Sequence, residues 1–335
     1  MHQNRIALLG IFLVCGDQSP AADSMDLSLK LVQVTKIWDQ APHNAFTDLI
    51  RFQDRWYCVF REGTGHKTGA GKIRVLVSEN GEKWESAALL ETKDVDLRDP
   101  KLSQMPDGRL MLLGGAAVPA SRDPLTDHYS FVSFSKNGKD WTQPQRVLDS
   151  WQWLWRVTWH KDAVYGVAKW VPPSRENLAA LYKSKDGLKY EKVADLKLRY
   201  LSEATLVFDG DVLYCLERRS KGSPDTAVLG RSEPPYTNWT WKDLGVTIGG
   251  PNLLRFSDGT WLAASRLRQQ DQSRTVLFQL DPKAGALRPV LTLPSGGDNS
   301  YPGLVWHDNQ LWVSYYSSHK DKASIYLARL QRVAP

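Results

Sequence analysis

The chain contains the stretch Ser-Glu-Asn-Gly-Glu-Lys-Trp at residues 78–84, and close copies of this stretch begin at Ser135 and Ser184. The starting positions 78, 135 and 184 lie 57 and then 49 residues apart, and a degenerate fourth copy covers 232–239. In each copy an Asp or Asn side chain can accept bonds from nearby backbone N–H groups, and the Gly can adopt a positive φ. The repeat therefore predicts tight turns with a structural role, each covered by its aromatic residue.

A second repeat alternates with these turns. It consists of an apolar strand, a polar turn and another apolar or aromatic strand, and three of its turns contain Asp-Gly, which favours β-hairpins. Repetition at about 50 residues is typical of propeller blades. We therefore expect an all-β fold, a six-bladed β-propeller of four-stranded antiparallel blades. The hairpins would form the two inner strands of each blade, at 46–61, 98–113, 155–170, 203–218, 252–266 and 301–316.

Length and composition agree with this expectation. The 335 residues carry 43 Lys and Arg against 37 Asp and Glu, a net charge of +6, with 42% hydrophobic and 24% charged residues. These values exclude a disordered chain and a multi-pass membrane protein. The 14 Trp, 12 Tyr and 9 Phe favour strands. We expect one propeller domain over 23–335.

The N-terminus has the layout of a secretory signal peptide. A basic start is followed by the apolar run 6–15 and by small residues before an expected cleavage near Ala21 or Ala22. The run is too short to span a bilayer, and no apolar run of eighteen or more residues follows it. Residues 1–22 would thus be removed, which predicts a secreted or periplasmic protein. A lipoprotein anchored at Cys15 and a buried N-terminal strand are the weaker alternatives.

Cysteines and basic residues indicate no further class of site. Cys58 and Cys215 lie in apolar strand-like runs, which predicts two buried free thiols. Neither has neighbours at zinc-ligand spacing, so we expect no metal and no cofactor. Basic residues are dispersed and no nucleic-acid motif is present, so we expect a glycan rather than nucleic acid as the binding partner. We also expect the protein to be a monomer.

The repeated turns resemble the Asp boxes of sialidases, although each is one residue shorter. On the predicted inner strands, Glu203 and Arg218 lie fifteen residues apart, Arg266 follows one blade later, and Tyr301 begins the last blade. This order of Glu, Arg, Arg and Tyr is similar to that of the sialidase superfamily (family 33-like glycoside hydrolases). The resemblance covers 40–330.

The resemblance implies roles for these residues. Tyr301 would be the nucleophile of a retaining exo-glycosidase that releases a terminal sialic acid or similar anionic sugar, and Glu203 would be its base. Tyrosine suits this task because a carboxylate nucleophile would be repelled by the substrate carboxylate. Arg218 and Arg266 would bind that carboxylate, since a guanidinium matches it in a bidentate manner.

The sequence departs from the family at two points. Thr47 stands where sialidases carry their first Arg, and no Glu follows Tyr301 to support such an Arg. Candidates to complete the carboxylate clamp are Arg61, Arg98 and Arg156. The acid that protonates the leaving oxygen is not obvious, and its candidates are Asp48, His66, Glu62 and Asp99, with Asp48 and His66 ranked first.

Competing interpretations remain open at this point. Glu203 and Arg218 could form a plain cross-strand ion pair, and the alternating Trp151, Trp153 and Trp155 could either stack on a sugar or pack between blades. The protein could be a different exo-glycosidase, a polysaccharide lyase that uses Tyr and His, or a non-catalytic glycan-binding or protein-binding propeller. Catalysis requires Tyr301 to contact Glu203, whereas binding alone does not.

Overall fold

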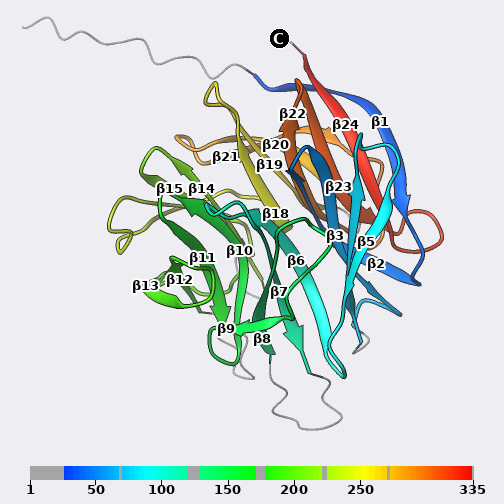
Figure 1. The fold of residues 1–335 in the computed structure, drawn as a ribbon. Helices are drawn as coiled ribbons and strands as arrows, with labels where there is room; N and C mark the ends of the chain where they lie inside the picture. The colour runs from blue at the N-terminus through cyan, green and yellow to red at the C-terminus, as the bar shows by residue number, and fades with distance from the viewer. Residues whose placement is uncertain are drawn as a thin grey trace, which may run out of the picture.

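The computed structural model describes residues 26–67, 70–118, 128–170, 178–220, 225–269 and 272–333. These residues form six four-stranded antiparallel sheets arranged as the blades of a propeller, as predicted (Figure 1). The signal-peptide prediction for 1–22 lies outside the described residues. The described residues contain no helix that is long and apolar enough to cross a membrane.

Each of the first five blades is one continuous stretch of chain. Blade 1 comprises β2 (His43–Phe52), β3 (Arg55–Gly63), β4 (Lys72–Ser78) and β5 (Glu85–Leu90), and blade 2 comprises β6 (Asp96–Gln104), β7 (Leu110–Ala117), β8 (His128–Ser135) and β9 (Gln145–Val147). Blade 3 comprises β10 (Gln152–His160), β11 (Ala163–Trp170), β12 (Ala179–Ser184) and β13 (Tyr190–Asp195), and blade 4 comprises β14 (Leu201–Asp209), β15 (Val212–Arg219), β16 (Val228–Ser232) and β17 (Thr240–Asp243). Blade 5 comprises β18 (Ile248–Arg255), β19 (Trp261–Gln269), β20 (Gln272–Asp281) and β21 (Ala286–Thr292).

The sixth blade closes the ring with both ends of the chain. It contains β22 (Asn299–His307), β23 (Gln310–Ser317), β24 (Ser324–Val333) and, as its outer strand, β1 (Ser28–Trp38). Strand β1 runs antiparallel to β24, with Ser28 opposite Val333 (Figure 1). The two ends of the chain thus share one sheet, and this pairing completes the sixth blade. The hairpin repeat did not reveal this closing strand.

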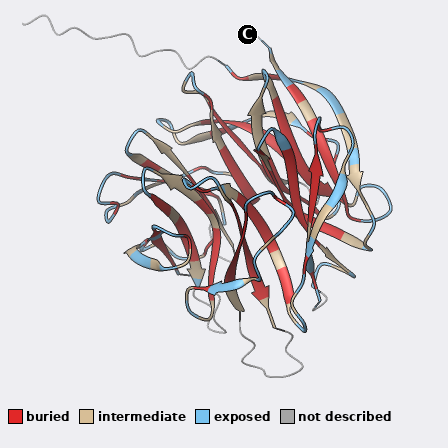
Figure 2. Ribbon diagram, viewed as in Figure 1, coloured by how far each residue is buried: buried red, intermediate tan, exposed pale blue. Residues whose placement is uncertain are grey.

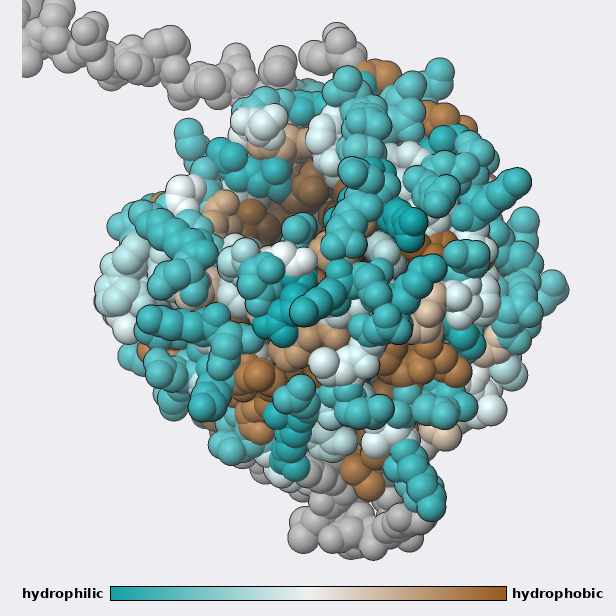
Figure 3. Space-filling view, in the orientation of Figure 1, coloured by the Kyte–Doolittle hydropathy of each residue, from teal (hydrophilic) through white to brown (hydrophobic). Residues whose placement is uncertain are grey.

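The first strand of each blade lies innermost, because these strands contact one another around the ring. Buried side chains concentrate on them and on the second strands, while outer strands such as β5 and β17 are largely exposed (Figure 2). Six apolar clusters fill the spaces between the strands. Mainly hydrophilic side chains cover the face seen in Figure 3. Cys58 and Cys215 are buried free thiols, as predicted.

In blades 1 to 3 the polar turns join the two outer strands, and the glycine of each turn also packs against the preceding blade. In the turn between β8 and β9, the Gly138 N–H donates to Ser135 Oγ at 2.8 Å, and Trp141 Nε1 donates to the Gly138 carbonyl at 3.1 Å. Gly138 has a φ of 73°, and an added Cβ would lie 2.2 Å from the ring of Tyr57 in blade 1. The Tyr57 hydroxyl donates to the carbonyl of Asn137 at 2.9 Å. The structural role predicted for these turns is thus to link neighbouring blades.

All six inner strands share one irregularity. Each carries a β-bulge at the same position, where two residues of the inner strand face one residue of the second strand. Four of these positions have a positive φ, namely Phe46 (65°), Asp99 (51°), Gly250 (62°) and Tyr301 (52°). Bulges redirect side chains, and strained non-Gly residues of this kind often mark functional sites. This ring of bulges surrounds the propeller axis.

Candidate active site

Tyr301 and Glu203 meet where blades 4 and 6 approach the axis. The Tyr301 hydroxyl donates to Glu203 Oε1 at 2.7 Å, and Arg218 Nη1 donates to the same oxygen at 2.8 Å. The backbone N–H of Gly250 donates to Glu203 Oε2 at 2.6 Å. The contact between Tyr301 and Glu203 that catalysis requires is therefore present, and Glu203 has partners other than Arg218.

The electrostatic environment sets the charge of this pair. Burial raises the pKa of Glu203, but the cations Arg218 and Lys169 and the hydrogen bonds from Tyr301 and Gly250 outweigh burial and lower it to about 2. Burial, together with the negative charge of Glu203, raises the pKa of Tyr301 well above its ordinary value. The resting site thus holds a carboxylate that accepts a bond from a neutral phenol.

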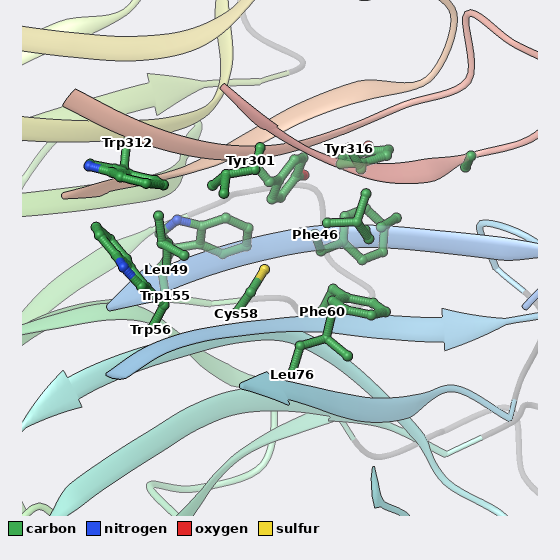
Figure 4. Close-up of a cluster of buried hydrophobic side chains, with 14 of the residues drawn as sticks. Phe46, Leu49, Trp56, Cys58, Phe60, Leu76, Trp155, Tyr301, Trp312 and Tyr316 are labelled. Carbon is green, nitrogen blue, oxygen red and sulfur yellow. The ribbon is translucent and has the colours of Figure 1, made fainter. Parts of the chain in front are cut away.

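Aromatic rings border Tyr301. Phe46 lies 5.0 Å from it between ring centroids, Trp155 lies 5.5 Å away, and Tyr316 lies 5.9 Å away. Figure 4 shows that Phe46, Tyr301 and Tyr316 face one another across the gap between blades 1 and 6. These rings belong to one buried cluster and give Tyr301 an apolar setting.

The three alternating tryptophans have different surroundings. Trp155 contacts Tyr301, whereas Trp151 stacks on His128 of blade 2 at 5.2 Å between centroids. Trp153 fills the space above Gly115, where an added Cβ would lie 2.0 Å from its ring. Trp153 thus packs between blades, and only Trp155 borders the group around Tyr301.

Arg266 and Arg98 approach the same group from other blades. Arg266 Nη1 donates to the backbone carbonyl of Asn299 at 3.1 Å, two residues before Tyr301. The Arg98 guanidinium lies 5.2 Å above the ring of Phe46 and donates to Asp96 Oδ2 at 3.1 Å. Both side chains are partly exposed, so each can contact a ligand at the axis.

Asp99 and two lysines complete the centre. Lys101 Nζ lies 5.2 Å from the Trp155 ring and 5.7 Å from the Tyr301 ring, and Lys169 Nζ lies 5.6 Å from Trp155. Within the described residues, no hydrogen bond or ion pair involves the Asp99 carboxyl. Burial raises the pKa of Asp99, although Arg98 and Lys101 partly offset the increase. Burial also disfavours the charged form of Lys101, and it lowers the pKa of that ammonium group to about 8.

The structure places Asp48 and Arg156 against each other rather than against Tyr301. Arg156 donates to both oxygens of Asp48 at 3.0 Å, and the Leu102 N–H donates to Asp48 Oδ2 at 2.8 Å. The Asp48 carboxylate is thus occupied by structural partners that join blades 1, 2 and 3. Neither its predicted role as acid nor that of Arg156 in a clamp gains support from this geometry.

Arg61 and Glu62 are also occupied by structural partners. Arg61 is fully buried and donates from Nε to Asp96 Oδ1 at 2.7 Å and from Nη1 to the Gly65 carbonyl at 2.9 Å. Glu62 accepts bonds from Trp38 and Arg74. Arg61 therefore anchors the segment after β3 instead of facing the axis.

His66 lies in that segment, on the other side of the aromatic group. Its ring centroid is 5.1 Å from that of Phe46, and its Nδ1 lies 2.7 Å from Asp298 Oδ2. His43 Nε2 lies 3.2 Å from the same oxygen, and the Tyr316 hydroxyl donates to Asp298 Oδ1 at 2.7 Å. These three contacts outweigh burial and lower the pKa of Asp298. His66 is therefore exposed at the rim and held by a carboxylate.

Sequence reasoning ranked Asp99 behind Asp48 and His66 and did not name Lys101, Lys169, His43 or Asp298 as site residues, which the structure places near the same group. One signal could have identified Asp99, because Asp99, Gly250 and Tyr301 each precede a proline at the same position of their blades. Aligning the blades on this proline would have placed Asp99 and Tyr301 on the same ring.

Comparison with known proteins adds the fold context. No family model matches the sequence, and no curated protein matches it either. Among solved structures, a protein of unknown function from Dyadobacter fermentans DSM 18053 has a TM-score of 0.81 at 18% identity, over 91% of this chain and 100% of that chain.

Two of the similar structures are glycosidases. Trypanosoma rangeli sialidase in complex with sialic acid has a TM-score of 0.67 at 12% identity, and the match covers 92% of this chain and 60% of that chain. A mutant of the α-L-arabinofuranosidase Arb93A from Fusarium graminearum, bound to an iminosugar inhibitor, has a TM-score of 0.69 at 11% identity, over 89% of this chain and 98% of that chain. At these identities the likeness shows the fold alone, which is a sialidase-like six-bladed propeller of the kind found in glycoside hydrolases.

Proposed function

We propose that the protein is a retaining exo-glycosidase of the sialidase superfamily, with Tyr301 as nucleophile and Glu203 as its base. The observation that carries this proposal is the 2.7 Å hydrogen bond from the Tyr301 hydroxyl to the buried Glu203 carboxylate. A tyrosine of raised pKa is a poor nucleophile unless an adjacent base removes its proton. Catalysis by a tyrosine nucleophile requires that contact, whereas binding alone does not.

In the first step, the Tyr301 oxygen attacks the anomeric carbon while its proton passes to Glu203. The bond from that carbon to the leaving oxygen breaks, and an acid donates a proton to the oxygen. Because Glu203 is a weak base with a pKa of about 2, the proton moves only as the new C–O bond forms. Water then attacks the anomeric carbon, the C–O bond to Tyr301 breaks, and Glu203 returns the proton.

Asp99 is the acid in this scheme. It lies on the same bulge ring as Tyr301, its carboxyl makes no hydrogen bond among the described residues, and burial raises its pKa, which favours the protonated form. It would protonate the leaving oxygen in the first step and take a proton from water in the second. His66, exposed at the rim, is the competing candidate for this role.

The charges around Tyr301 favour an anionic sugar. Arg218, Arg266 and Arg98 would hold its carboxylate, with Arg98 over Phe46 in place of the Arg that sialidases carry in blade 1. Lys101 adds positive charge near the Tyr301 ring, and Lys169 adds it near the Trp155 ring. Sialic acid is the best candidate substrate, and membership of family 33 is part of the proposal.

Thr47 favours a second candidate, an exo-glycosidase for a neutral sugar. Its hydroxyl donates to the Tyr301 carbonyl at 2.7 Å and lies 3.0 Å from Ser314 Oγ, so blade 1 contributes no cation at this position. The structural similarity to an α-L-arabinofuranosidase is compatible with that candidate.

We also propose that the chain is secreted or periplasmic, after cleavage of 1–22, and that it acts as a monomeric single domain. The support is the apolar run 6–15 with small residues after it. The N-terminal sequence and the native mass of the secreted protein test this part.

The activity test uses umbelliferyl glycosides of sialic acid, a uronic acid and a neutral pentose. Wild type is compared with Tyr301→Phe and with Tyr315→Phe, a control that removes a buried hydroxyl bonded to the Pro294 carbonyl. We expect turnover of the sialoside by wild type and the control only. A fluorinated sialosyl donor, whose second step is slow, should label Tyr301 in a peptide mass map. Turnover of only the pentoside would favour the neutral-sugar candidate, and no turnover of any glycoside would favour a lyase or a binding protein.

A further inference from the structure

Three possible metal ligands converge at the rim of the central site from three separate segments. His43 lies in β2, His66 follows β3, and Asp298 directly precedes β22. Their ligand atoms, two imidazole nitrogens and one carboxylate oxygen, all lie within 4.8 Å of one another. The chain spacing concealed the group, because His66 and Asp298 are 232 residues apart.

The donor set suits a transition-metal cation. Two imidazoles and one carboxylate, with remaining positions open, form the ligand set of catalytic zinc sites and of related iron sites. Both histidines direct a nitrogen at the same oxygen, Asp298 Oδ2, at 3.2 and 2.7 Å. A tetrahedral ion with ligand bonds of about 2.0 Å separates its ligand atoms by roughly 3.3 Å, so His66 Nδ1 and Asp298 Oδ2, now 2.7 Å apart, would have to separate by roughly half an ångström to hold one ion.

The surroundings hold the carboxylate in place. The Tyr316 hydroxyl donates to the other oxygen, Asp298 Oδ1, and Ser318 Oγ accepts from the Asp298 backbone N–H at 2.8 Å. Such outer contacts orient the ligands of metal sites. The positive charge of Arg266 disfavours a cation, but Arg266 Nη1 lies 4.0 Å from Asp298 Oδ1, whereas both histidines contact the other oxygen, Oδ2.

We propose that His43, His66 and Asp298 bind one divalent transition-metal ion of the zinc class. His66 is 44% exposed, so the open coordination positions face solvent at the entrance to the site. Phe46, which is itself buried, contacts both His66 and Tyr301, so a sugar bound at Tyr301 would lie about one ring away from the ion. An oxygen of that sugar would take an open position. Metal binding does not depend on the glycosidase proposal.

The test measures metal binding directly on the full chain without a polyhistidine tag. Zn²⁺ is titrated calorimetrically, the bound metal is counted after dialysis, and Co²⁺ serves as a visible-absorption probe of imidazole ligation. His66→Ala removes an exposed ligand with little expected cost to folding. The matched control is His160→Ala, because His160 pairs with Asp211 at 2.9 Å without a second histidine.

We expect one Zn²⁺ per wild-type chain, a loss of affinity of at least about tenfold in His66→Ala, and no change in His160→Ala. Wild type should also unfold at a higher temperature with Zn²⁺ than without it, whereas His66→Ala should not. Absence of Zn²⁺ binding by wild type, or equal binding by the two variants, would overturn the proposal. If wild type binds no metal while His66→Ala slows the release of poor leaving groups, His43, His66 and Asp298 act in proton transfer instead of metal binding.

Discussion

Two buried carboxylates of the inner strands, Asp48 and Glu203, each pair with an arginine, and the two pairs differ in what remains accessible. In the first, Asp48 accepts two bonds from Arg156 and one from the Leu102 N–H. In the second, Glu203 accepts a single bond from Arg218, and its remaining partners are the Gly250 N–H and the Tyr301 hydroxyl. The Arg156 side chain is 12% exposed and that of Arg218 is 26% exposed.

The comparison teaches that buried charge alone does not identify an active site. Asp48 has only partners that hold blades together, so the pair is a fixed link across the ring. Glu203 accepts a bond from the hydroxyl of the proposed nucleophile, and its arginine is more exposed than Arg156. The type of partner, rather than burial or charge, distinguishes the two pairs.

The largest expected effect comes from removing the charge of Glu203. In Glu203→Gln the base is lost, so kcat should fall by about 10³-fold or more. Steady-state kinetics on the substrate that wild type turns over provide the measurement. Near-UV circular dichroism checks that the variant is folded. Retention of more than a tenth of the activity would assign Glu203 to structure, like Asp48.

The converse variant, Asp48→Asn, should lose stability rather than chemistry. It leaves Arg156 buried without a charged partner, which costs about 3 kcal/mol or more in the free energy of unfolding. Urea unfolding measures this cost. The kcat per folded molecule should stay within about threefold of wild type. A stable but inactive Asp48→Asn protein would restore Asp48 as the acid.

Asp99→Asn tests the proposed acid independently of the proposed base, Glu203. Loss of the acid should slow the hydrolysis of glycosides with poor leaving groups by about 10²-fold or more. Hydrolysis of glycosides with good leaving groups should slow much less, because a good leaving group needs little protonation. The comparison uses a natural disaccharide linkage against an activated aryl glycoside. His66→Ala is the parallel variant. If only His66→Ala shows the dependence on the leaving group, His66 is the acid.

The smallest effect concerns a third buried carboxyl, Glu217, which has no cation within ion-pair distance among the described residues. Burial raises its pKa from 4.5 to about 8. Its folded-state pKa lies above the unfolded value, so its contribution to stability is complete below 4.5 and is lost as pH rises toward 8.

Between about pH 5 and about pH 9, the free energy of unfolding should therefore fall less in Glu217→Gln than in wild type. The two decreases should differ by more than about 1 kcal/mol. The Ser202 N–H can still donate to the new side chain, as it does to Glu217 Oε1 at 2.7 Å. Urea unfolding at the two pH values measures the difference. Lys101, whose pKa is lowered to about 8, is present in both proteins and cancels in the comparison. Parallel pH curves would show that Glu217 is ionised in the folded protein.

Much of the fold could be predicted because its signals are local. Alternating strands, Asp-Gly turns and the repeated polar turns act over a few residues, so they appear directly in the sequence. Glu203 and Arg218 could be predicted as neighbours for the same reason, since one hairpin brings them together across 15 residues. Their order with Arg266 and Tyr301 led to the group around Tyr301.

The tertiary structure alone decided the partners across the ring. Arg156 reaches Asp48 over 108 residues, and β1 completes the blade that begins with β22. Closing six blades around an axis brings distant strand ends together, and no local pattern encodes which ends meet. The same closure gathered His43, His66 and Asp298. The sequence by itself thus determined the blades and one hairpin of the site, whereas ring closure decided which charged side chains are free to react.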